Sequence, residues 1–289
     1  MIKATFRSFL FLSRTIPELV IGTGSFGSFP VCMSAYLLRI PLFIQEQNTI
    51  PGKANNLLGK FARKIFLAFP NSSFQPAKTL VVGNPVGRQR LDLDKKVCYE
   101  RFNLDMKKKT LLIFGGSQGA LSLNSWFMNL LDGMGDLKDW QIIHITGKMD
   151  YERVKERYRN LPISSSVLPF LYPMDYAYRI SDLAVSRGGA ISLSELSFWG
   201  IPALIVPYSY STDNHQEYNA RYFQEKGGVY LLKAEEMEDG RFSQNLKELL
   251  NDSKKLKLMS EKMKKILRND ALEKTCEEIH RYINHENYQ

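Results

Sequence analysis

A junction between a strand and a helix occupies residues 183–195, which read LAVSRGGAISLSE. It begins with a short apolar run, turns at two glycines and continues with helical character. Ligands of open α/β sheets bind at the carboxyl ends of the strands, where such junctions lie. Glu195 falls one and a half turns into the predicted helix, where its carboxylate could reach the hydroxyls of a ribose. The alternative is a solvated glutamate, or an acid that caps the helix start.

The same alternation of apolar runs and helical patterns extends through most of the 289 residues. The second half contains predicted strands at 111–114, 142–145, 167–170, 183–186, 203–206 and 229–232. The first half contains about four, at 19–21, 42–44, 65–69 and 80–82, with helices at about 30–38 and 53–61. A polar stretch, 87–109, is predicted to be a linker with one short helix, and three helical segments close the chain at 242–287.

Fully apolar strands separated by helices predict parallel sheets that are covered on both faces. The length fits two domains. We therefore predict an α/β protein with two Rossmann-like, doubly wound domains, at 1–88 and 89–289. The first domain is expected to be incomplete, because the chain starts on a helix and lacks the strand and phosphate-binding turn that normally open such a domain.

The chain contains 39 Lys and Arg residues and 30 Asp and Glu residues, so its net charge is +9. This excess of positive charge favours an anionic partner. The three cysteines are far apart, which argues against a disulfide framework or a zinc site. No apolar run approaches the ~20 residues that span a bilayer. Residues 1–14 lack the features of a signal peptide, so we expect the protein to stay inside the cell.

Two glycine-rich turns could bind phosphate. Residues 115–119, GGSQG, follow an apolar strand and open a helix, where free backbone N–H groups and the Ser117 hydroxyl could hold a phosphate. Residues 22–27, GTGSFG, match the dinucleotide pattern G-x-G-x-x-G, and Glu46 lies about where a ribose-binding acid would sit. This second turn raises the alternative of an NAD-type oxidoreductase, although it does not follow the first strand of a complete βαβ unit.

Other polar residues are weaker candidates. Gln216 follows the strand at 203–206 and could face a ligand, unless this segment is simply a helix capped by Asn214. His144 lies within an apolar strand and is predicted to be a core histidine. Asp92 and Asp94 form a D-x-D pair in the linker, where solvated carboxylates are more common than metal ligands. No metal site is predicted.

The opening helix has a basic stripe beside an apolar face. The stripe consists of Lys3, Arg7 and Arg14, and the apolar face of Ile2, Phe6, Phe9, Leu10 and Ile16. This pattern suits an anionic membrane surface. The alternative is an ordinary amphipathic helix packed on the sheet.

Taken together, the motifs resemble those of the MurG family of peptidoglycan N-acetylglucosaminyltransferases, and they occur in the family's order from residue 1 to about 270. The matching pieces are GTGSFGSFP at 22–30, QEQN at 45–48, PG at 51–52 with Asn55, FP at 69–70, GNPV at 83–86, GGSQG at 115–119, TGK at 146–148, RGGAISLSE at 187–195, GIPA at 200–203, and HQ at 215–216 with Asn219 and Ala220.

The resemblance implies a GT-B-type inverting glycosyltransferase whose two domains face each other across a cleft. The donor would be UDP-GlcNAc, held mainly by the second domain without a metal or another cofactor. The acceptor would be lipid I, undecaprenyl-pyrophosphoryl-MurNAc-pentapeptide, which the reaction converts to lipid II for peptidoglycan synthesis. The protein would lie peripherally on the cytoplasmic face of the inner membrane and bind no nucleic acid.

The resemblance also assigns residues. Ser117 would contact the donor diphosphate, Glu195 the ribose and Gln216 the GlcNAc hydroxyls, while Asn48 would line the cleft from the first domain. The uracil would lie beside Leu171 and the backbone of Ala190 and Ile191. The remaining substrate-binding assignments are Arg88, Ser192, Leu193 and Ser194.

Three departures from the family pattern matter. The family's opening strand and glycine-rich loop, which ends in a histidine favoured as the acceptor-activating base, have no counterpart, so no catalytic residue is assigned. Gln45 stands where the family usually has histidine, and Gly87 displaces Arg88 by one position. We expect the native protein to be longer, with an intact mass above the 33.2 kDa of this chain. A shortened, inactive protein that binds sugar nucleotides is the alternative.

Overall fold

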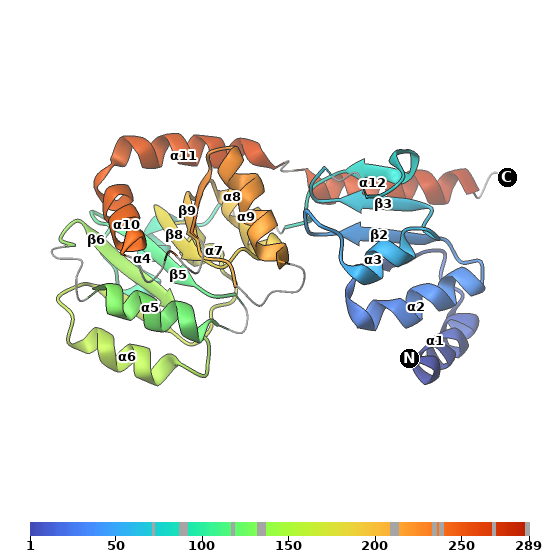
Figure 1. Ribbon diagram of the computed structural model, residues 1–289, viewed down its shortest axis with the longest axis horizontal. Helices are drawn as coiled ribbons and strands as arrows, with labels where there is room; N and C mark the ends of the chain where they lie inside the picture. Colours follow the sequence, from blue (N-terminus) through green and yellow to red (C-terminus); the bar gives the residue numbers. More distant parts are fainter. Residues whose placement is uncertain are drawn as a thin grey trace. The chain divides into compact units, whose positions relative to one another are not determined.

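The computed structural model describes residues 1–70, 73–86, 92–116, 119–131, 137–208, 214–232, 236, 240–267 and 270–286. The chain forms two compact units, one of residues 1–86 with 268–289 and one of residues 87–267 (Figure 1). Each unit contains a parallel β-sheet with helices packed on it. The predicted α/β class with two parallel-sheet domains is confirmed.

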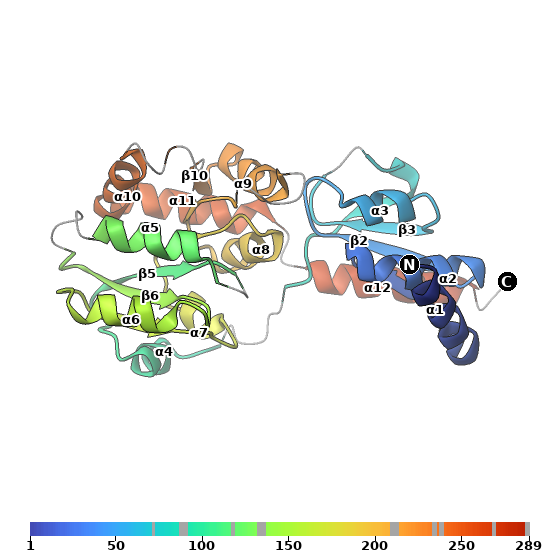
Figure 2. The same cartoon turned by 60° about the horizontal axis from the view of Figure 1, so that its bottom comes forward.

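The first unit is built on a four-stranded sheet in the order β1-β2-β3-β4. Its elements are α1 (Ile2–Thr15), β1 (Val20–Gly22), α2 (Ser25–Leu37), β2 (Leu42–Glu46), α3 (Lys53–Leu58), β3 (Lys64–Leu67), the 3₁₀ turn η1 (Pro76–Lys78), β4 (Thr79–Val81) and α12 (Ala271–Glu286). Both faces of the central strand β2 are buried, as expected for a strand covered by helices on each side. Helix α1 packs along α2, as Figures 1 and 2 show.

Helix α12 belongs to the first unit. The domain boundaries predicted from the sequence assign all the closing helices to the second domain. Ile279 and Tyr282 pack against the sheet residues Phe43 and Phe66, and the rings of Phe43 and Tyr282 meet edge to face with centroids 5.0 Å apart. Lys64 on β3 also forms an ion pair of 3.5 Å with Glu278. The prediction failed because an amphipathic helix shows that one face must be buried and does not identify the surface that buries it.

The second unit is built on a six-stranded sheet in the order β10-β9-β8-β5-β6-β7. Its elements are α4 (Lys95–Phe102), β5 (Lys109–Phe114), α5 (Leu121–Leu131), β6 (Trp140–Ile145), α6 (Tyr151–Arg159), β7 (Ser165–Leu168), α7 (Asp175–Tyr178), β8 (Leu183–Ser186), α8 (Ala190–Trp199), β9 (Ala203–Ile205), α9 (His215–Glu225), β10 (Val229–Leu231), α10 (Arg241–Asn251) and α11 (Ser253–Ile266).

Strands β5 and β8 are neighbours in this sheet, but the chain leaves them in opposite directions. After β5 it runs through α5 to β6 on one side, and after β8 it runs through α8 to β9 on the other. Adjacent strands with diverging connections form a switch point, and ligands of such sheets bind outside the carboxyl ends of these strands. The fold therefore places the loops at 115–120 and 187–189 together at one edge.

The core of the second unit contains a buried histidine, as predicted. The two ring nitrogens of His144 lie 3.1 Å from the Tyr158 hydroxyl and 3.1 Å from Oδ1 of Asn124. Burial lowers the pKa of His144 to about 3, so the ring is neutral in the folded protein. It fills the core and takes no part in the candidate site.

None of the helices in the described part of the chain is long and apolar enough to cross a bilayer.

Candidate functional site

The turn after β5 fits closely against the neighbouring strand. Gly119 has a φ of +75°, and a Cβ atom at this position would lie 2.4 Å from the carbonyl oxygen of Thr146 at the end of β6. Gly116 also has a positive φ, +95°. Such backbone needs glycine, which explains the glycines at positions 116 and 119 between β5 and α5. Ser117, the predicted phosphate contact, lies outside the described residues.

Arg187 braces the switch point from inside. Its guanidinium is buried and donates to the carbonyl oxygens of Val206 and Pro207, at 3.0 and 3.1 Å, and to Oγ of Ser122 at 2.6 Å. These bonds tie the end of β8 to the end of β9 and to the first turn of α5. Burial lowers the pKa of Arg187, and the three acceptors compensate for the lost hydration. The sequence contained no signal for this bracing role.

Helix α8 presents free backbone donors at the same edge. Gly189 is its N-cap and has no side chain to satisfy the first N–H groups. The N–H groups of Ala190, Ile191 and Ser192 therefore lack intrahelical partners by geometry, and such donors favour an anionic or carbonyl ligand. The contacts of Ala190 and Ile191 with the uracil, and the substrate contact of Ser192, stay predictions.

Leu193 and Ser194 are also among the predicted substrate-binding residues, but their side chains are buried within the second unit. The N–H of Leu193 donates to the carbonyl of Gly189 at 2.9 Å, and its side chain is fully buried. The Ser194 hydroxyl donates to the carbonyl of Ala190 at 2.8 Å. The predicted ligand contacts of this stretch thus depend on the first three residues of α8 and on Glu195.

Glu195 is held by a tyrosine from a preceding element. The hydroxyl of Tyr178, at the end of α7, donates to Oε2 of Glu195 at 2.8 Å. Burial raises the pKa of Glu195 and the Tyr178 bond opposes that rise, while burial raises the pKa of Tyr178 well above its usual range. Glu195 is half-buried and oriented, which excludes both a freely solvated glutamate and a helix-capping acid.

The start of α9 lies against the junction between β8 and α8. A Cβ atom on Gly188 would be 2.2 Å from the carbonyl oxygen of Gln216, and Nδ2 of Asn219 donates to the carbonyl of Gly188 at 3.3 Å. Oε1 of Gln216 accepts from the N–H of Tyr208 at 2.9 Å, which fixes the orientation of this amide. Asn214 precedes α9 without a side-chain capping bond. The structure thus brings together two stretches that the sequence separates by about 20 residues.

Two residues of this unit that are predicted to bind substrate, Leu171 and Arg88, have no described contact with the start of α8 or the start of α9. Leu171 is buried and follows β7, a strand at the edge of the sheet, so its place beside the uracil stays a prediction. Arg88 lies outside the described residues.

Asn48 lies in the first unit, in a polar cluster at the carboxyl end of β2. Its backbone N–H and its Nδ2 both donate to Oε1 of Glu46, at 2.9 and 3.2 Å. The other carboxylate oxygen, Oε2, accepts from Nδ2 of Asn55 at 2.8 Å and from the N–H of Gly52 at 3.1 Å. Glu46 therefore orders the loop that carries Asn48.

These bonds also decide the dinucleotide alternative. Glu46 would have to bind ribose hydroxyls, but it is 1% exposed and four donors from its own loop occupy both oxygens. The G-x-G-x-x-G match at 22–27 is therefore a turn that enters α2, and the NAD-type reading of this turn is wrong.

The D-x-D pair also has a structural explanation. Oδ1 of Asp94 accepts from the N–H of Lys96 at 2.8 Å and caps α4. Within the described ranges, no group of three or more His, Cys, Asp or Glu residues is placed to hold a metal ion.

Comparisons with known proteins match both halves of the chain. Residues 1–67 match the glycosyltransferase family 28 N-terminal domain, and residues 110–275 match the C-terminal domain of the same family.

Curated relatives extend the match over most of the chain. A UDP-N-acetylglucosamine--N-acetylmuramyl-(pentapeptide) pyrophosphoryl-undecaprenol N-acetylglucosamine transferase of Thermodesulfovibrio yellowstonii is 37% identical over 90% of this chain and 72% of its own length. The transferase of the same name from Oenococcus oeni is 36% identical over 98% of this chain and 77% of its own.

A solved structure agrees with these sequences. The crystal structure of Acinetobacter baumannii MurG superposes with a TM-score of 0.79 at 28% identity, over 97% of this chain and 79% of that one. A Staphylococcus aureus MnaA–UDP structure, with a TM-score of 0.71 at 16% identity, shares the fold. By its sequence, its fold and the order of its motifs, the chain belongs to the MurG family within glycosyltransferase family 28.

Proposed function

We propose that this chain transfers N-acetylglucosamine from UDP-GlcNAc to the MurNAc unit of undecaprenyl-pyrophosphoryl-MurNAc-pentapeptide, with inversion at the anomeric carbon. The observation that carries the proposal is the match of nearly the whole chain to transferases whose names state this reaction. A hydroxyl oxygen of MurNAc attacks C1 of GlcNAc, the bond from C1 to the diphosphate breaks, and UDP leaves. The hydroxyl proton goes to a base that we do not assign.

The donor would lie at the carboxyl edge of the second sheet. The carboxylate of Glu195 accepts from the two ribose hydroxyls, and Tyr178 fixes its direction. Leu171 and the backbone of Ala190 and Ile191, at the start of α8, border the uracil. The turn at 115–119, with Ser117, stabilises the charge that grows on the diphosphate as the bond breaks. Gln216 binds the GlcNAc hydroxyls, while Asn48 and Arg88 contribute to substrate binding from the chain preceding β5.

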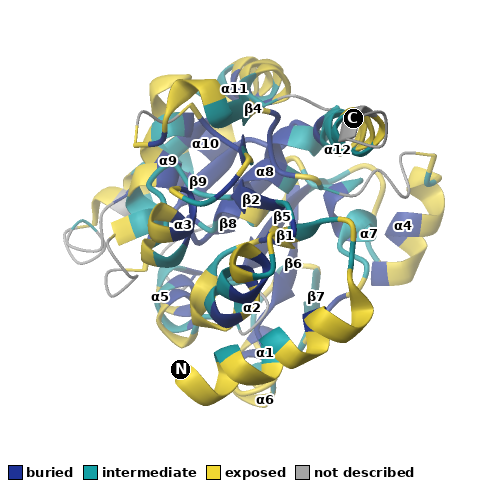
Figure 3. Cartoon of the chain, turned by 90° about the vertical axis from the view of Figure 1, so that its right-hand side faces the viewer, coloured by how far each residue is buried: buried dark blue, intermediate teal, exposed yellow. Residues whose placement is uncertain are grey.

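Helix α1 would bring the protein to the anionic cytoplasmic surface of the inner membrane. Figure 3 shows α1 largely exposed, and Phe6 and Leu10 are 62% and 39% exposed one turn apart. Leu12 is the residue of α1 that packs inward, against Ala35 and Ile40. The apolar face therefore remains uncovered beside Lys3 and Arg7, which favours a peripheral membrane contact over packing on the sheet.

A turnover assay tests the proposal. The purified chain is given UDP-GlcNAc with and without a lipid I analogue, and both UDP release and the disaccharide product are measured. We expect acceptor-dependent release and a β-linked product. Donor binding without turnover would replace the transferase by a protein that only binds sugar nucleotides.

Tyr178→Phe should weaken UDP-GlcNAc binding about tenfold at pH 8, because it removes one hydrogen bond to a charged group. The wild-type affinity should fall as the pH drops toward the raised pKa of Glu195, since the protonated carboxyl loses acceptor capacity. Without the tyrosine bond that pKa rises further, so the fall should begin at a higher pH. Calorimetric titration from pH 5 to 8 measures both effects. Tyr230→Phe, on β10, removes a hydroxyl elsewhere and should leave the profile unchanged.

Phe6→Ser combined with Leu10→Ser should reduce binding to vesicles that contain phosphatidylglycerol by about tenfold or more, because each lost side chain removes apolar contact area. Cosedimentation measures the bound fraction, and added salt should weaken binding by screening Lys3 and Arg7. The control pair Met106→Ser and Leu258→Ser removes two exposed apolar side chains from the second unit. Equal loss in both pairs would contradict a specific role for α1.

A further inference from the structure

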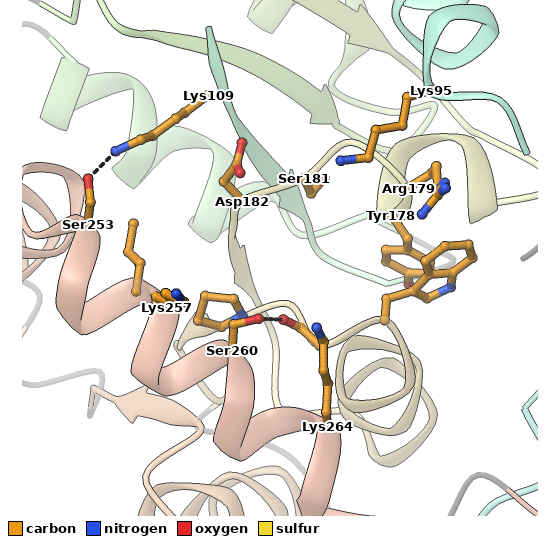
Figure 4. Close-up of a pocket in the computed structure, with 14 residues that line it drawn as sticks. Lys95, Lys109, Tyr178, Arg179, Ser181, Asp182, Ser253, Lys257, Ser260 and Lys264 are labelled. Carbon is orange, nitrogen blue, oxygen red and sulfur yellow. Dashed lines mark hydrogen bonds between the residues drawn. The ribbon is translucent and has the colours of Figure 1, made fainter. Parts of the chain in front are cut away.

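A second pocket opens at the other end of the second sheet, where its parallel strands begin. It is a cavity of about 370 Å³. Its wall includes Lys109 at the start of β5, Asp182 just before β8 and Pro202 just before β9, and α11 closes one side (Figure 4). The volume falls within the range of small-molecule sites. The proposed donor site lies at the carboxyl edge, so this pocket is separate from it.

The pocket gathers positive charge from several elements. Five cationic side chains line it against the single carboxylate of Asp182: Lys95 from α4, Lys109 from β5, Arg179 from the end of α7, and Lys257 and Lys264 from α11. Figure 4 shows Lys95 reaching toward Ser181 from one side, with α11 carrying Lys257 and Lys264 on the other.

Asp182 offsets part of this charge, because its carboxylate attracts Lys95 and Lys109. Within the described part of the chain, Lys95, Lys257 and Lys264 form no close ion pair. Lys109 donates to the hydroxyl of Ser253, and Nε of Arg179 donates to the carbonyl of Leu93 at 3.0 Å, so both meet neutral acceptors. Asp182 already accepts from the N–H of Thr110 at 2.8 Å. Like charges brought together in this way repel one another unless an anion joins them.

One of these lysines, Lys264, packs closely on the backbone of Gly200. Gly200 has a φ of +67°, and a Cβ atom there would lie 2.4 Å from Cε of Lys264. The Lys264 stem thus runs directly over the glycine backbone. The hydroxyl of Ser260, one turn earlier on α11, donates to the carbonyl of Gly200 at 2.6 Å and holds the two segments together.

We propose that this pocket binds a phosphate-bearing ligand with at least two negative charges. Several ammonium groups and one guanidinium that line one open pocket match a diphosphate better than a single carboxylate. The rings of Trp199 and Tyr178 in the wall add an apolar surface for an attached group. The phosphate is either free in solution or part of a lipid headgroup.

Inorganic pyrophosphate is the probe, titrated calorimetrically into the whole chain in the presence of saturating UDP. UDP serves to occupy the turn at 115–119. We expect one saturable pyrophosphate site, weakened about tenfold or more by Lys257→Met combined with Lys264→Met. Methionine keeps the unbranched stem that packs on Gly200, and thermal unfolding checks the fold. The matched control, Lys254→Met with Lys265→Met, removes two exposed charges from the same helix outside the pocket.

The same three proteins are sedimented with phosphatidylcholine vesicles with and without cardiolipin, whose headgroup carries two phosphates. If the Lys257/Lys264 variant loses pyrophosphate binding but still binds vesicles, the ligand is a free phosphate compound. If it loses vesicle binding but still binds pyrophosphate, the ligand is a lipid headgroup. Equal behaviour of all three proteins in both assays overturns the proposal. The result does not depend on the proposed function. If UDP does not bind, pyrophosphate can bind at both the proposed donor site and this pocket, and the Lys257/Lys264 variant still loses binding at the pocket.

Discussion

Glu195→Ala should weaken UDP-GlcNAc binding about a hundredfold or more. The substitution removes the acceptor for two ribose hydroxyls, and each hydrogen bond to a charged group contributes about 1.5–3 kcal/mol. It also leaves the buried hydroxyl of Tyr178 without its carboxylate partner. Turnover at fixed donor concentration should fall in parallel. Calorimetric titration with UDP-GlcNAc, with NAD as a second titrant, measures the loss.

Glu195→Gln is the matched control for charge. It keeps the shape and an acceptor for Tyr178 but loses the negative charge, so its affinity should lie between those of the wild type and the alanine variant. Unchanged donor binding in folded Glu195→Ala would remove Glu195 from the donor site and leave the ribose without an assigned partner.

Gly188→Ala should be strongly destabilising, although it adds only one methyl group at the candidate site. The added Cβ would lie 2.2 Å from the backbone oxygen of Gln216. Because this atom belongs to the backbone, no side-chain rotation can relieve the overlap. Overpacking of this kind costs about 1–3 kcal/mol, and more where backbone must shift. We expect a loss of about 3 kcal/mol, a fall in melting temperature of about 5–10 °C, and weaker donor binding because α9 carries Gln216.

The adjacent Gly189 supplies the control. Its φ is −64°, and a Cβ atom there would lie 3.7 Å from its nearest neighbour, Oγ of Ser192, which is ordinary contact. Gly189→Ala should therefore change stability by less than about 0.5 kcal/mol. Thermal unfolding and UDP-GlcNAc titration of both variants make the comparison, and equal effects at the two positions would contradict the close approach of α9.

The sequence predicts the strands of this fold well, because buried parallel strands are short, apolar and bounded by turn residues. The run predicted at 111–114 is the carboxyl end of β5, and the run predicted at 183–186 is β8. Helix starts were less predictable. The sequence predicts that a helix starts at about Pro30, but α2 begins at Ser25 and Pro30 lies inside it. Proline is a start signal only in a helix's first turn, so the pattern misplaced the boundary by five residues.

The candidate site was predictable where one segment carries the whole signal. The stretch at 187–195 places Glu195 on its helix without knowledge of any other element. Tyr178 was missed because it meets Glu195 only after α7 and α8 pack, and a tyrosine at the end of a short helix has no distinctive pattern. The bracing role of Arg187 and the approach of α9 to Gly188 are likewise tertiary contacts.

The length of β5 has a consequence for the two ends of the second sheet. Six residues of parallel strand span about 20 Å, which is roughly twice the distance over which physiological salt screens a charge. Salt in the solvent therefore weakens the direct interaction between an anion at the strand starts and a diphosphate at the strand ends. The two ends also share one side chain. The ring of Tyr178 lines the cationic pocket while its hydroxyl donates to Glu195, so one buried tyrosine belongs to both ends of the sheet.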